Sequence, residues 1–315
     1  MRVGSLFAGV GGIDLGFEKA GFKTVWANEM DSYAAETFKA NFDCELVVDD
    51  IRNVNVEHIP DIDILVAGFP CQAFSVAGYR KGFEDDRGNV YFEVVKVFEA
   101  KKPQIVFLEN VKNLIGHDNG NTFRVILESL RENGYKVKYQ VLNACDYGNV
   151  PQNRERIYVV AFQDEEVYKN FEFPDPIELT TKLNDVIDFE NLQDSKYYYS
   201  EDSCKFYEEL KKGMNKENTI YQWRRVYVRE NKSNLCPTLT ANMGTGGHNV
   251  PLIYSKKGIR KLTPRECFNI QGFDKEFILP DKLSNTRLYK QAGNSVSVPV
   301  IERIAKQIRK DLDKE

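Results

Sequence analysis

The chain has 315 residues, with 43 Lys and Arg against 47 Asp and Glu and a formal net charge of −4 at pH 7. This balance excludes a globally basic protein, so any nucleic-acid surface must be local, built from a few clustered cations. Six cysteines without CxxC spacing and only three histidines disfavour a zinc cluster or a disulfide framework. No apolar run approaches the roughly 20 residues that span a bilayer, and no signal peptide precedes the first strand, so we expect a cytoplasmic protein.

Short apolar runs alternate with helix-period segments from the start of the chain to about Phe162. The predicted strands are Val3–Phe7, Thr24–Ala27, Leu46–Val48, Ile62–Ala67, Ile105–Leu108, Tyr135–Leu142 and Ile157–Phe162. The predicted helices are Gly12–Ala20, Tyr33–Asn41, Tyr91–Ala100 and Thr122–Asn133. This alternation predicts an α/β fold with a mostly parallel, doubly wound sheet. The last two strands follow each other without a clear helix, which predicts an antiparallel edge.

The character of the chain changes after Pro174. The stretch 189–264 is polar, rich in Lys, Asn and Tyr, and without a clear period, as expected of a second domain or a large insertion. Order returns from about Leu288, and an amphipathic helix is predicted over Pro299–Leu312. We therefore predict a large domain over 1–188, a second domain with a hinge over 189–285, and a C-terminal segment over 286–315 that returns to the large domain.

Two strand ends carry residues that suggest covalent chemistry. Cys71 follows the apolar run 63–67, and Glu109 follows Ile105–Leu108, so both are expected at the edge of the sheet where open α/β folds bind ligands. A nucleophile beside a carboxylate suits covalent catalysis with an acid partner. A lone cysteine is more often a small buried apolar residue, because a reactive thiol needs a lowered pKa and access.

A glycine turn, Phe7–Gly12, follows the first strand. Glycines there let a ligand approach the backbone, and the helix that follows offers unpaired N–H groups. The spacing is not the dinucleotide GxGxxG, because Asp14 stands in the place of the third glycine. The next two strands end near Glu29 and Asp50, where acids bind ribose hydroxyls or an adenine amino group. This favours a nucleoside cofactor, S-adenosylmethionine rather than NAD, over tight glycine packing and helix capping by the acids.

Taken together, these segments resemble the DNA (cytosine-5)-methyltransferase family of bacterial modification enzymes. The matching segments occur in the family's order: Phe7–Gly12, Asn28-Glu29, Asp50-Ile51, Gly68–Gln72, Glu109–Val111, Gln152–Arg156, Arg265–Phe273 and Gln291–Val296. The resemblance implies a Rossmann-like, S-adenosylmethionine-dependent catalytic domain over 1–188 and a smaller target-recognition domain over 189–285, with DNA in the cleft between them. The uncovered interval, about 189–250, corresponds to the family's variable recognition region, which ends with a Thr-Leu pair like Thr238-Leu239.

The resemblance also implies catalytic roles. Cys71 matches the nucleophile that adds to C6 of a flipped-out cytosine within a specific double-stranded DNA sequence, so that C5 can take the methyl group. Glu109 matches the residue that contacts cytosine N3 and the exocyclic amine as a general acid. Arg154 matches the arginine near cytosine O2 and Glu109, whereas Arg156 is the weaker match and could instead anchor backbone.

Cofactor and DNA contacts follow from the same resemblance. The pocket for S-adenosyl-L-methionine is expected to involve Phe7, Gly9, Gly11, Glu29, Met30, Asp50, Ile51, Asn294 and Ser295. Met30 stands where several members carry an aromatic over the adenine, and a thioether covers a ring face too. The stretch 72–88 resembles the mobile loop that closes over DNA. The expected DNA contacts, to bases or to phosphates, are Gln72, Lys81, Arg87, Arg224, Arg225, Thr240, Asn242, Gly246 and His248. Trp223 is expected to be a packing anchor.

The resemblance implies a stand-alone, monomeric enzyme, the modification half of a restriction-modification system, with double-stranded DNA as its partner. A cognate restriction endonuclease acting on the same site is the further partner to look for, and no metal, membrane contact or obligate protein partner is expected. The nearest competing function is tRNA cytosine-5 methylation, although the Cys-Phe-Thr signature of that branch is absent, since Pro237-Thr238 follow Cys236. A catalytically silent DNA-binding protein on this fold and, more distantly, a nicotinamide-dependent dehydrogenase also compete with it.

Overall fold

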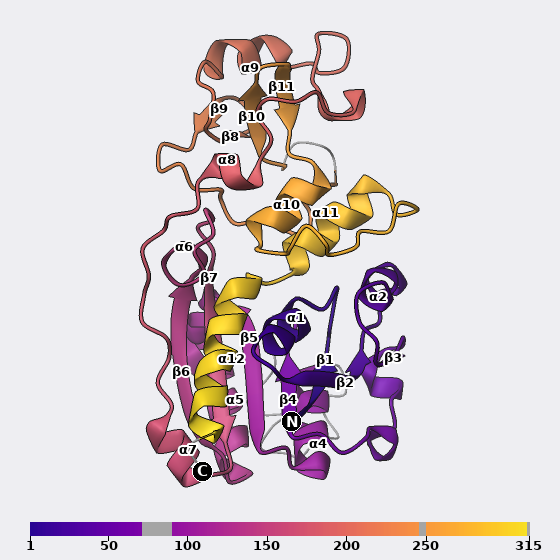
Figure 1. The fold of residues 1–315 in the computed structure, drawn as a ribbon, viewed down its shortest axis with the longest axis vertical. Coiled ribbons are helices and arrows are strands. Elements are labelled where there is room, and N and C mark those ends of the chain that lie inside the picture. Colours follow the sequence, from indigo (N-terminus) through magenta and orange to yellow (C-terminus); the bar gives the residue numbers. More distant parts are fainter. Residues whose placement is uncertain (71–89, 246–249, 314–315) are drawn as a thin grey trace. The chain divides into compact units, whose positions relative to one another are not determined.

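The computed structural model describes residues 1–70, 90–245 and 250–313 (Figure 1). Contacts divide the chain into two compact units. Unit 1 comprises Met1–Leu142, Glu155–Asp175 and Val300–Glu315, and unit 2 comprises Asn143–Arg154 and Pro176–Pro299. The predicted boundaries at 188 and 285 divide the chain by function and stay a prediction.

Unit 1 is built on a seven-stranded sheet with the order β3-β2-β1-β4-β5-β7-β6. The strands are β1 (Arg2–Leu6), β2 (Lys23–Asn28), β3 (Glu45–Val47), β4 (Ile64–Ala67), β5 (Ile105–Val111), β6 (Lys136–Asn143) and β7 (Glu155–Phe162). The strands from β3 to β5 pair in parallel, whereas β7 is antiparallel to β5. The predicted α/β fold, with a mostly parallel sheet and antiparallel pairing toward one edge, is confirmed.

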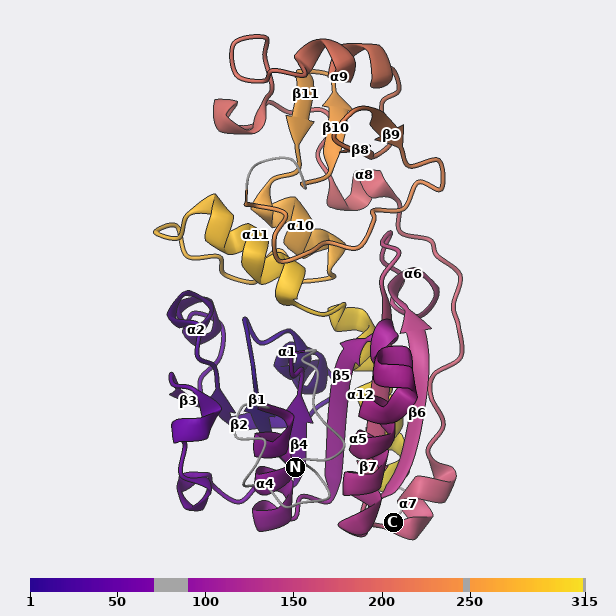
Figure 2. The ribbon, with the colours of Figure 1, turned by 180° about the vertical axis from the view of Figure 1, so that it is seen from behind.

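Helices cover both faces of this sheet, which explains why its central strands are continuous apolar runs. Figures 1 and 2 show α1 (Gly12–Lys19) and α12 (Val298–Leu312) on one face, and α4 (Val90–Lys101) and α5 (Asn121–Glu132) on the other. One core cluster joins α4 and α5 to β4 and β5 and includes Phe98, Leu130, Leu65 and Val106. Between β2 and β3 lies α2 (Ser32–Lys39), which begins at Asp31 because that carboxylate accepts from two backbone N–H groups. A short α7 (Glu165–Asn170) follows β7.

Unit 2 contains a four-stranded sheet with the order β11-β10-β8-β9. Its strands are β8 (Tyr221–Trp223), β9 (Val228–Glu230), β10 (Leu252–Ser255) and β11 (Gly258–Lys261), and its helices are α6 (Ala144–Tyr147), α8 (Leu183–Val186), α9 (Tyr207–Gly213), α10 (Pro264–Ile270) and α11 (Asn285–Asn294). The described strand pairs are antiparallel. A small core that includes Leu210, Tyr221, Leu252 and Ile259 lies beneath them. The polar, aperiodic stretch therefore folds as short elements around its own core.

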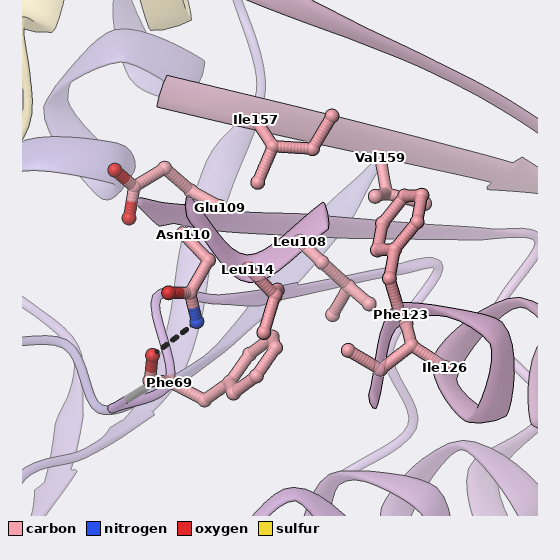
Figure 3. Close-up of a pocket in the computed structure, with 9 residues that line it drawn as sticks. All are labelled: Phe69, Leu108, Glu109, Asn110, Leu114, Phe123, Ile126, Ile157 and Val159. Atoms are coloured by element: carbon pink, nitrogen blue, oxygen red, sulfur yellow. Dashed lines mark hydrogen bonds between the residues drawn. The ribbon is translucent and has the colours of Figure 1, made fainter. Parts of the chain in front are cut away.

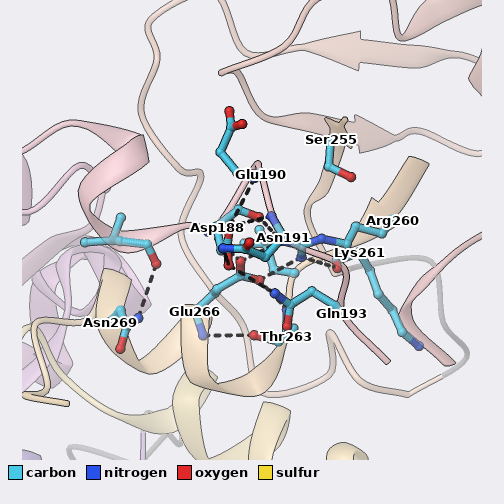
Figure 4. Close-up of polar contacts among 12 residues, drawn as sticks. Asp188, Glu190, Asn191, Gln193, Ser255, Arg260, Lys261, Thr263, Glu266 and Asn269 are labelled. Carbon is cyan, nitrogen blue, oxygen red and sulfur yellow. Dashed lines mark hydrogen bonds and ion pairs between the residues drawn. The ribbon is translucent and has the colours of Figure 1, made fainter. Parts of the chain in front are cut away.

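A buried ion pair joins three segments of unit 2 (Figure 4). Arg260 on β11 is fully buried, and its Nη2 lies 2.7 Å from Oε1 of Glu266 on α10. Both partners also bind the backbone of Asp188: Arg260 donates to its carbonyl at 2.6 Å, and Glu266 accepts from its N–H at 2.9 Å. Because loss of one partner would leave an uncompensated buried charge, this network holds the 188 segment firmly against β11 and α10.

Candidate active site

Six of the predicted site residues lie outside the described part of the chain: Cys71, Gln72, Lys81, Arg87, Gly246 and His248. The structure does describe β4 and the residues that lead from it toward Cys71. Phe69 is buried, and its carbonyl accepts a hydrogen bond of 2.8 Å from Nδ2 of Asn110, at the end of β5 (Figure 3). A Cβ placed on Gly68 would lie 3.6 Å from Oε2 of Glu109. The chain just before Cys71 therefore lies beside Glu109, as the sequence analysis expects of the two strand ends.

Glu109 is held by an arginine on the neighbouring strand. Nε of Arg156 lies 3.1 Å from Oε1 of Glu109, and both side chains are largely buried. In the antiparallel register of β5 and β7, Arg156 stands opposite Val111 and is the diagonal neighbour of Glu109. The sequence analysis expects Arg154 to make this contact. That assignment is wrong, because β7 begins at Glu155, so that Arg156 lies on the strand and Arg154 precedes it.

A very small apolar cavity, of about 10 Å³, lies beside Glu109 and Asn110. Its lining consists of Phe69, Leu108, Glu109, Asn110, Leu114, Phe123, Ile126, Ile157 and Val159. Figure 3 shows the carboxylate of Glu109 directed away from the apolar side chains of this cavity. The space is no larger than about one water molecule, so it cannot hold a nucleobase, and this side of Glu109 is a packed wall.

Arg154 anchors backbone in unit 2. Its side chain is only 3% exposed. Nη1 donates to the carbonyl of Leu239 at 2.9 Å, and Nη2 donates to the carbonyls of Gly293, at 3.2 Å, and Ser295. Backbone anchoring is the second role that the sequence analysis considers for Arg156, so the two arginines have exchanged roles.

The glycine turn after β1 leaves its backbone open at Gly9. This residue has φ +57°, and a Cβ there would meet no atom within 4 Å. Its N–H donates to Oε2 of Glu29 at 2.8 Å, while Oε1 of the same carboxylate accepts from the N–H of Asp31 at 2.7 Å. Glu29 is thus fixed beside open space at the end of β2. Each carboxylate oxygen carries a second lone pair, so these contacts are compatible with ligand hydroxyls.

Gly11 has a different explanation. Its φ is +85°, and a Cβ there would lie 2.1 Å from Cε2 of Phe42. Packing against Phe42 and the left-handed backbone therefore account for this glycine without any ligand. Phe7, at the start of the turn, also has a positive φ, of 55°, which is rare for a residue with a large side chain. Such strain is typical of turns at functional sites.

The other predicted cofactor residues of unit 1 lie around the ends of β2 and β3. Asp50 caps the short helix Ile51–Asn53 through the N–H of Arg52, and the Arg52 guanidinium lowers the pKa of Asp50 to about 2. This carboxylate is therefore an ionised acceptor at neutral pH, suited to an amino group. Ile51 is buried, whereas Met30 is 66% exposed and could be covered by a flat ring.

The predicted pair at the end of α11 lies in unit 2. Asn294 is exposed, and Ser295 is 8% exposed. Oγ of Ser295 is buried and has no hydrogen-bond partner among the residues that the structure describes. A buried hydroxyl without a partner is costly, so it suits a polar group of a ligand. The residues present thus fit a nucleoside cofactor, on the open space at Gly9 and on this hydroxyl.

The predicted DNA contacts of unit 2 are on its surface. Arg224 and Arg225 lie at the tip of the β8–β9 hairpin beside Val226 and Tyr227, which are 81% and 57% exposed. At the base of the hairpin the ring of Trp223 stacks on Phe206, with centroids 4.3 Å apart and planes 4° apart, so the packing role predicted for Trp223 is confirmed. Elsewhere on the surface, the exposed Thr240 donates from Oγ1 to Oδ1 of Asn242 at 2.8 Å.

The sequence analysis missed two buried glutamines. Gln152 and Gln271 are fully buried, and Nε2 of Gln152 donates to Oε1 of Gln271 at 3.0 Å. Oε1 of Gln152 accepts from the N–H of Leu239, and Nε2 of Gln271 donates to the carbonyl of Ala292 at 2.8 Å. The available signal was an amide inside a segment of the family resemblance, since a buried amide must find partners.

Within the described ranges, no three His, Cys, Asp or Glu side chains gather as metal ligands, and no helix combines the length and apolar character needed to cross a membrane. The family model for C-5 cytosine-specific DNA methylase matches residues 1–310. The chain is 64% identical over 314 residues to Type II methyltransferase M.Bsp6I of Bacillus sp. (strain RFL6), with 99% of each chain covered. It is 40% identical to Type II methyltransferase M.HhaI of Haemophilus parahaemolyticus, with 99% of this chain and 95% of the other covered.

Two solved structures share the fold at low identity. The S. pombe Dnmt2 methyltransferase has a TM-score of 0.76 at 18% identity, with 99% of each chain covered. A Spodoptera frugiperda DNMT2 mutant has a TM-score of 0.72 at 19% identity, with 98% of this chain and 99% of the other covered. At this identity the likeness concerns the fold alone.

Proposed function

The chain belongs to the C-5 cytosine-specific DNA methylase family, and from this premise we propose how it works. It is a DNA cytosine-5 methyltransferase. We propose that it transfers a methyl group from S-adenosyl-L-methionine to a flipped-out cytosine within a specific duplex sequence, through a covalent bond between Cys71 and cytosine C6. The observation that supports this most is the buried Glu109–Arg156 pair beside the strand end that leads to Cys71.

The chemistry requires both a nucleophile and an acid. C5 of cytosine is a poor nucleophile, and thiolate addition from Cys71 at C6 turns the ring into an enamine that can attack through C5. Glu109 protonates N3, or shares a proton with it, and so draws electrons away from C6. When bound, S-adenosylmethionine supplies the electrophilic methyl group. Loss of the C5 proton to a base then restores the double bond and expels the Cys71 thiolate.

Arg156 has a positioning role in this proposal. Its Nε holds one oxygen of Glu109, which gives the carboxylate a single orientation at the sheet edge. A planar guanidinium suits this task better than an ammonium group, because its donors have a fixed geometry.

The cofactor would be held by residues of both units. In unit 1, we propose that Phe7 and the backbone of Gly9 face the methionine part, Glu29 binds the ribose hydroxyls, and Asp50 accepts from the adenine amine, with Met30 and Ile51 as apolar walls. In unit 2, we propose Asn294 and the hydroxyl of Ser295. The open space at Gly9 and the buried Ser295 hydroxyl support this assignment.

DNA would be contacted by the exposed arginines of the β8–β9 hairpin and by the Thr240–Asn242 segment, with Gln72, Lys81, Arg87, Gly246 and His248 as further candidates. Arginine binds guanine edges and phosphates, and asparagine binds adenine edges. Relatives along the whole chain are named Type II methyltransferases. We therefore propose a monomeric modification enzyme with a cognate endonuclease that acts on the same site.

The test is covalent trapping followed by sequencing. The purified protein, with S-adenosylmethionine, should form a stable adduct with duplex DNA that contains 5-fluorocytosine, and bisulfite sequencing of DNA from expressing cells should show one methylated motif. The Cys71→Ser variant should lose both, whereas Cys44→Ser, whose thiol has its pKa raised to about 12 by burial, should keep both. Methylation confined to tRNA, binding without an adduct, or full activity of Cys71→Ser would overturn the proposal.

A further inference from the structure

We propose that Arg154 is a positioning residue that couples cofactor binding at Ser295 to DNA binding at Thr240 and Asn242. All four residues belong to unit 2. The inference rests on the proposed function for the identity of the two ligands, and it adds a link between their sites.

The Arg154 side chain joins two segments that are far apart in the sequence. Its guanidinium donates to the carbonyl of Leu239 on one side and to the carbonyls of Gly293 and Ser295 on the other. Hydrogen bonds from a charged donor are among the strong ones in proteins, and a guanidinium that is only 3% exposed depends on them. The three carbonyls are therefore held in one arrangement around Arg154.

Two glutamines join the same two segments a second time. Oε1 of Gln152 accepts from the N–H of Leu239 at 3.2 Å, so both peptide groups that flank this residue are bound by buried side chains. From Gln152 the connection continues through Gln271 to the carbonyl of Ala292. Two independent links make it difficult for one segment to move without the other.

The two backbones also touch directly. A Cβ placed on Gly293 would lie 2.2 Å from both the carbonyl carbon and the carbonyl oxygen of Thr240. No side chain could fit between the end of α11 and this strand of backbone. Any displacement of residues 293–295 is therefore transmitted to Thr240.

The ends of this bracket carry the polar groups that face the two ligands. Oγ of Ser295 is buried without a partner among the described residues, and the exposed Thr240 is hydrogen-bonded to Asn242. A cofactor that binds Ser295 would order residues 293–295 and, through Arg154, the Thr240–Asn242 segment. The ordering cost of DNA binding would then be lower. By linkage, each ligand raises the affinity of the other by the same factor.

The first experiment uses the wild-type protein. Amide hydrogen exchange is measured with and without S-adenosylhomocysteine, in the absence of DNA. We expect exchange in 238–242, including the Leu239 amide, to slow by about fivefold or more, as typical coupling energies imply. Protection that is confined to 1–60 and 293–296, with 238–242 unchanged, would overturn the inference.

The second experiment compares variants. The dissociation constant of S-adenosylhomocysteine is measured with and without a saturating duplex that carries the motif found by bisulfite sequencing. Arg265 is a matched control, since its Nη2 also donates to a carbonyl of unit 2, that of Phe277, at 2.6 Å. Wild type and Arg265→Met should show tighter cofactor binding with DNA, by about fivefold or more, and Arg154→Met should not.

Arg154→Lys, a milder change, should lose part of the coupling and remain folded. Coupling in Arg154→Met equal to that in Arg265→Met, or no coupling in wild type, would contradict the inference. Failure of the proposed function would look different, because wild type would then methylate no DNA at all.

Discussion

Arg156 on β7 holds Glu109 on β5 by an ion pair of 3.1 Å across two antiparallel strands. The geometry depends on the register, which makes these residues diagonal neighbours. It places a carboxylate with a fixed orientation beside Gly68, three residues before the cysteine to which the family resemblance gives the covalent step.

The first prediction concerns this pair. General acid–base catalysis contributes about 10²–10⁴-fold to rates, so Glu109→Gln should lower kcat for DNA methylation by about 100-fold or more. Arg156→Met should lower kcat too, because Glu109 loses its fixed orientation. Initial-rate assays with tritiated S-adenosylmethionine measure both. The control is Lys112→Met, which removes an exposed pair with Glu155 and should leave kcat unchanged; normal turnover in Arg156→Met would exclude a role for the pair.

The second prediction concerns the two glycines of the first turn. Gly9→Ala places a Cβ in the open space proposed for the cofactor, so binding of S-adenosylhomocysteine should weaken by about tenfold or more, which corresponds to roughly 1.4 kcal/mol. Its fold should lose only about 1–2 kcal/mol, for the positive φ. Gly11→Ala collides with Phe42 and should lose roughly 3 kcal/mol or more in urea unfolding. Unchanged cofactor affinity in Gly9→Ala would place the cofactor elsewhere.

The third prediction concerns Asp14, a fully buried carboxyl on α1 that accepts from the hydroxyls of Ser5 at 3.0 Å and Thr24 at 3.2 Å. Burial raises the pKa of Asp14 to about 7. The folded protein then keeps a proton that the unfolded chain releases from about pH 4, so the free energy of unfolding falls as pH rises from about 4 to 7.

Asp14→Asn removes this dependence. The variant should be more stable than wild type at pH 8, by up to about 4 kcal/mol, and the advantage should vanish near pH 4. Urea unfolding at both pH values measures it, with the exposed Asp43→Asn as a control that should change neither value. A variant that is less stable than wild type at pH 8 would show that the hydroxyl bonds outweigh burial.

The fourth prediction concerns the hairpin tip. Arg225 has φ +66°, so Arg225→Gly removes the charge at a position where glycine is unstrained, and the fold should be unaffected. If Arg225 contacts a phosphate, the slope of log affinity against log salt should become shallower by about 0.9. Fluorescence anisotropy with a labelled duplex at several salt concentrations measures this. Lys169→Ala, an exposed cation on α7 that pairs with Glu165 and Glu166, is the control and should not change the slope.

Much of unit 1 was predictable because its signals are local. Apolar runs of strand length separated by helix-period segments specify the parallel sheet, and the buried strand Ile64–Ala67 leads toward Cys71 where the pattern placed it. Glu29 and Asp50 follow the ends of β2 and β3, as expected of acids at the carboxyl edge. In each case a run of fewer than ten residues contains the information.

The sequence by itself determined the family, the alternation of elements and the residue types available at the sheet edge. Only the tertiary structure decided between Arg154 and Arg156, since their spacing of two puts both on the same side of an extended chain, and the choice depends on where β7 begins and which distant carbonyls lie within reach. The same holds for Gly9 and Gly11, which differ by the position of Phe42, and for the small core beneath the aperiodic recognition stretch. These contacts join residues far apart along the chain, and no local pattern encodes them.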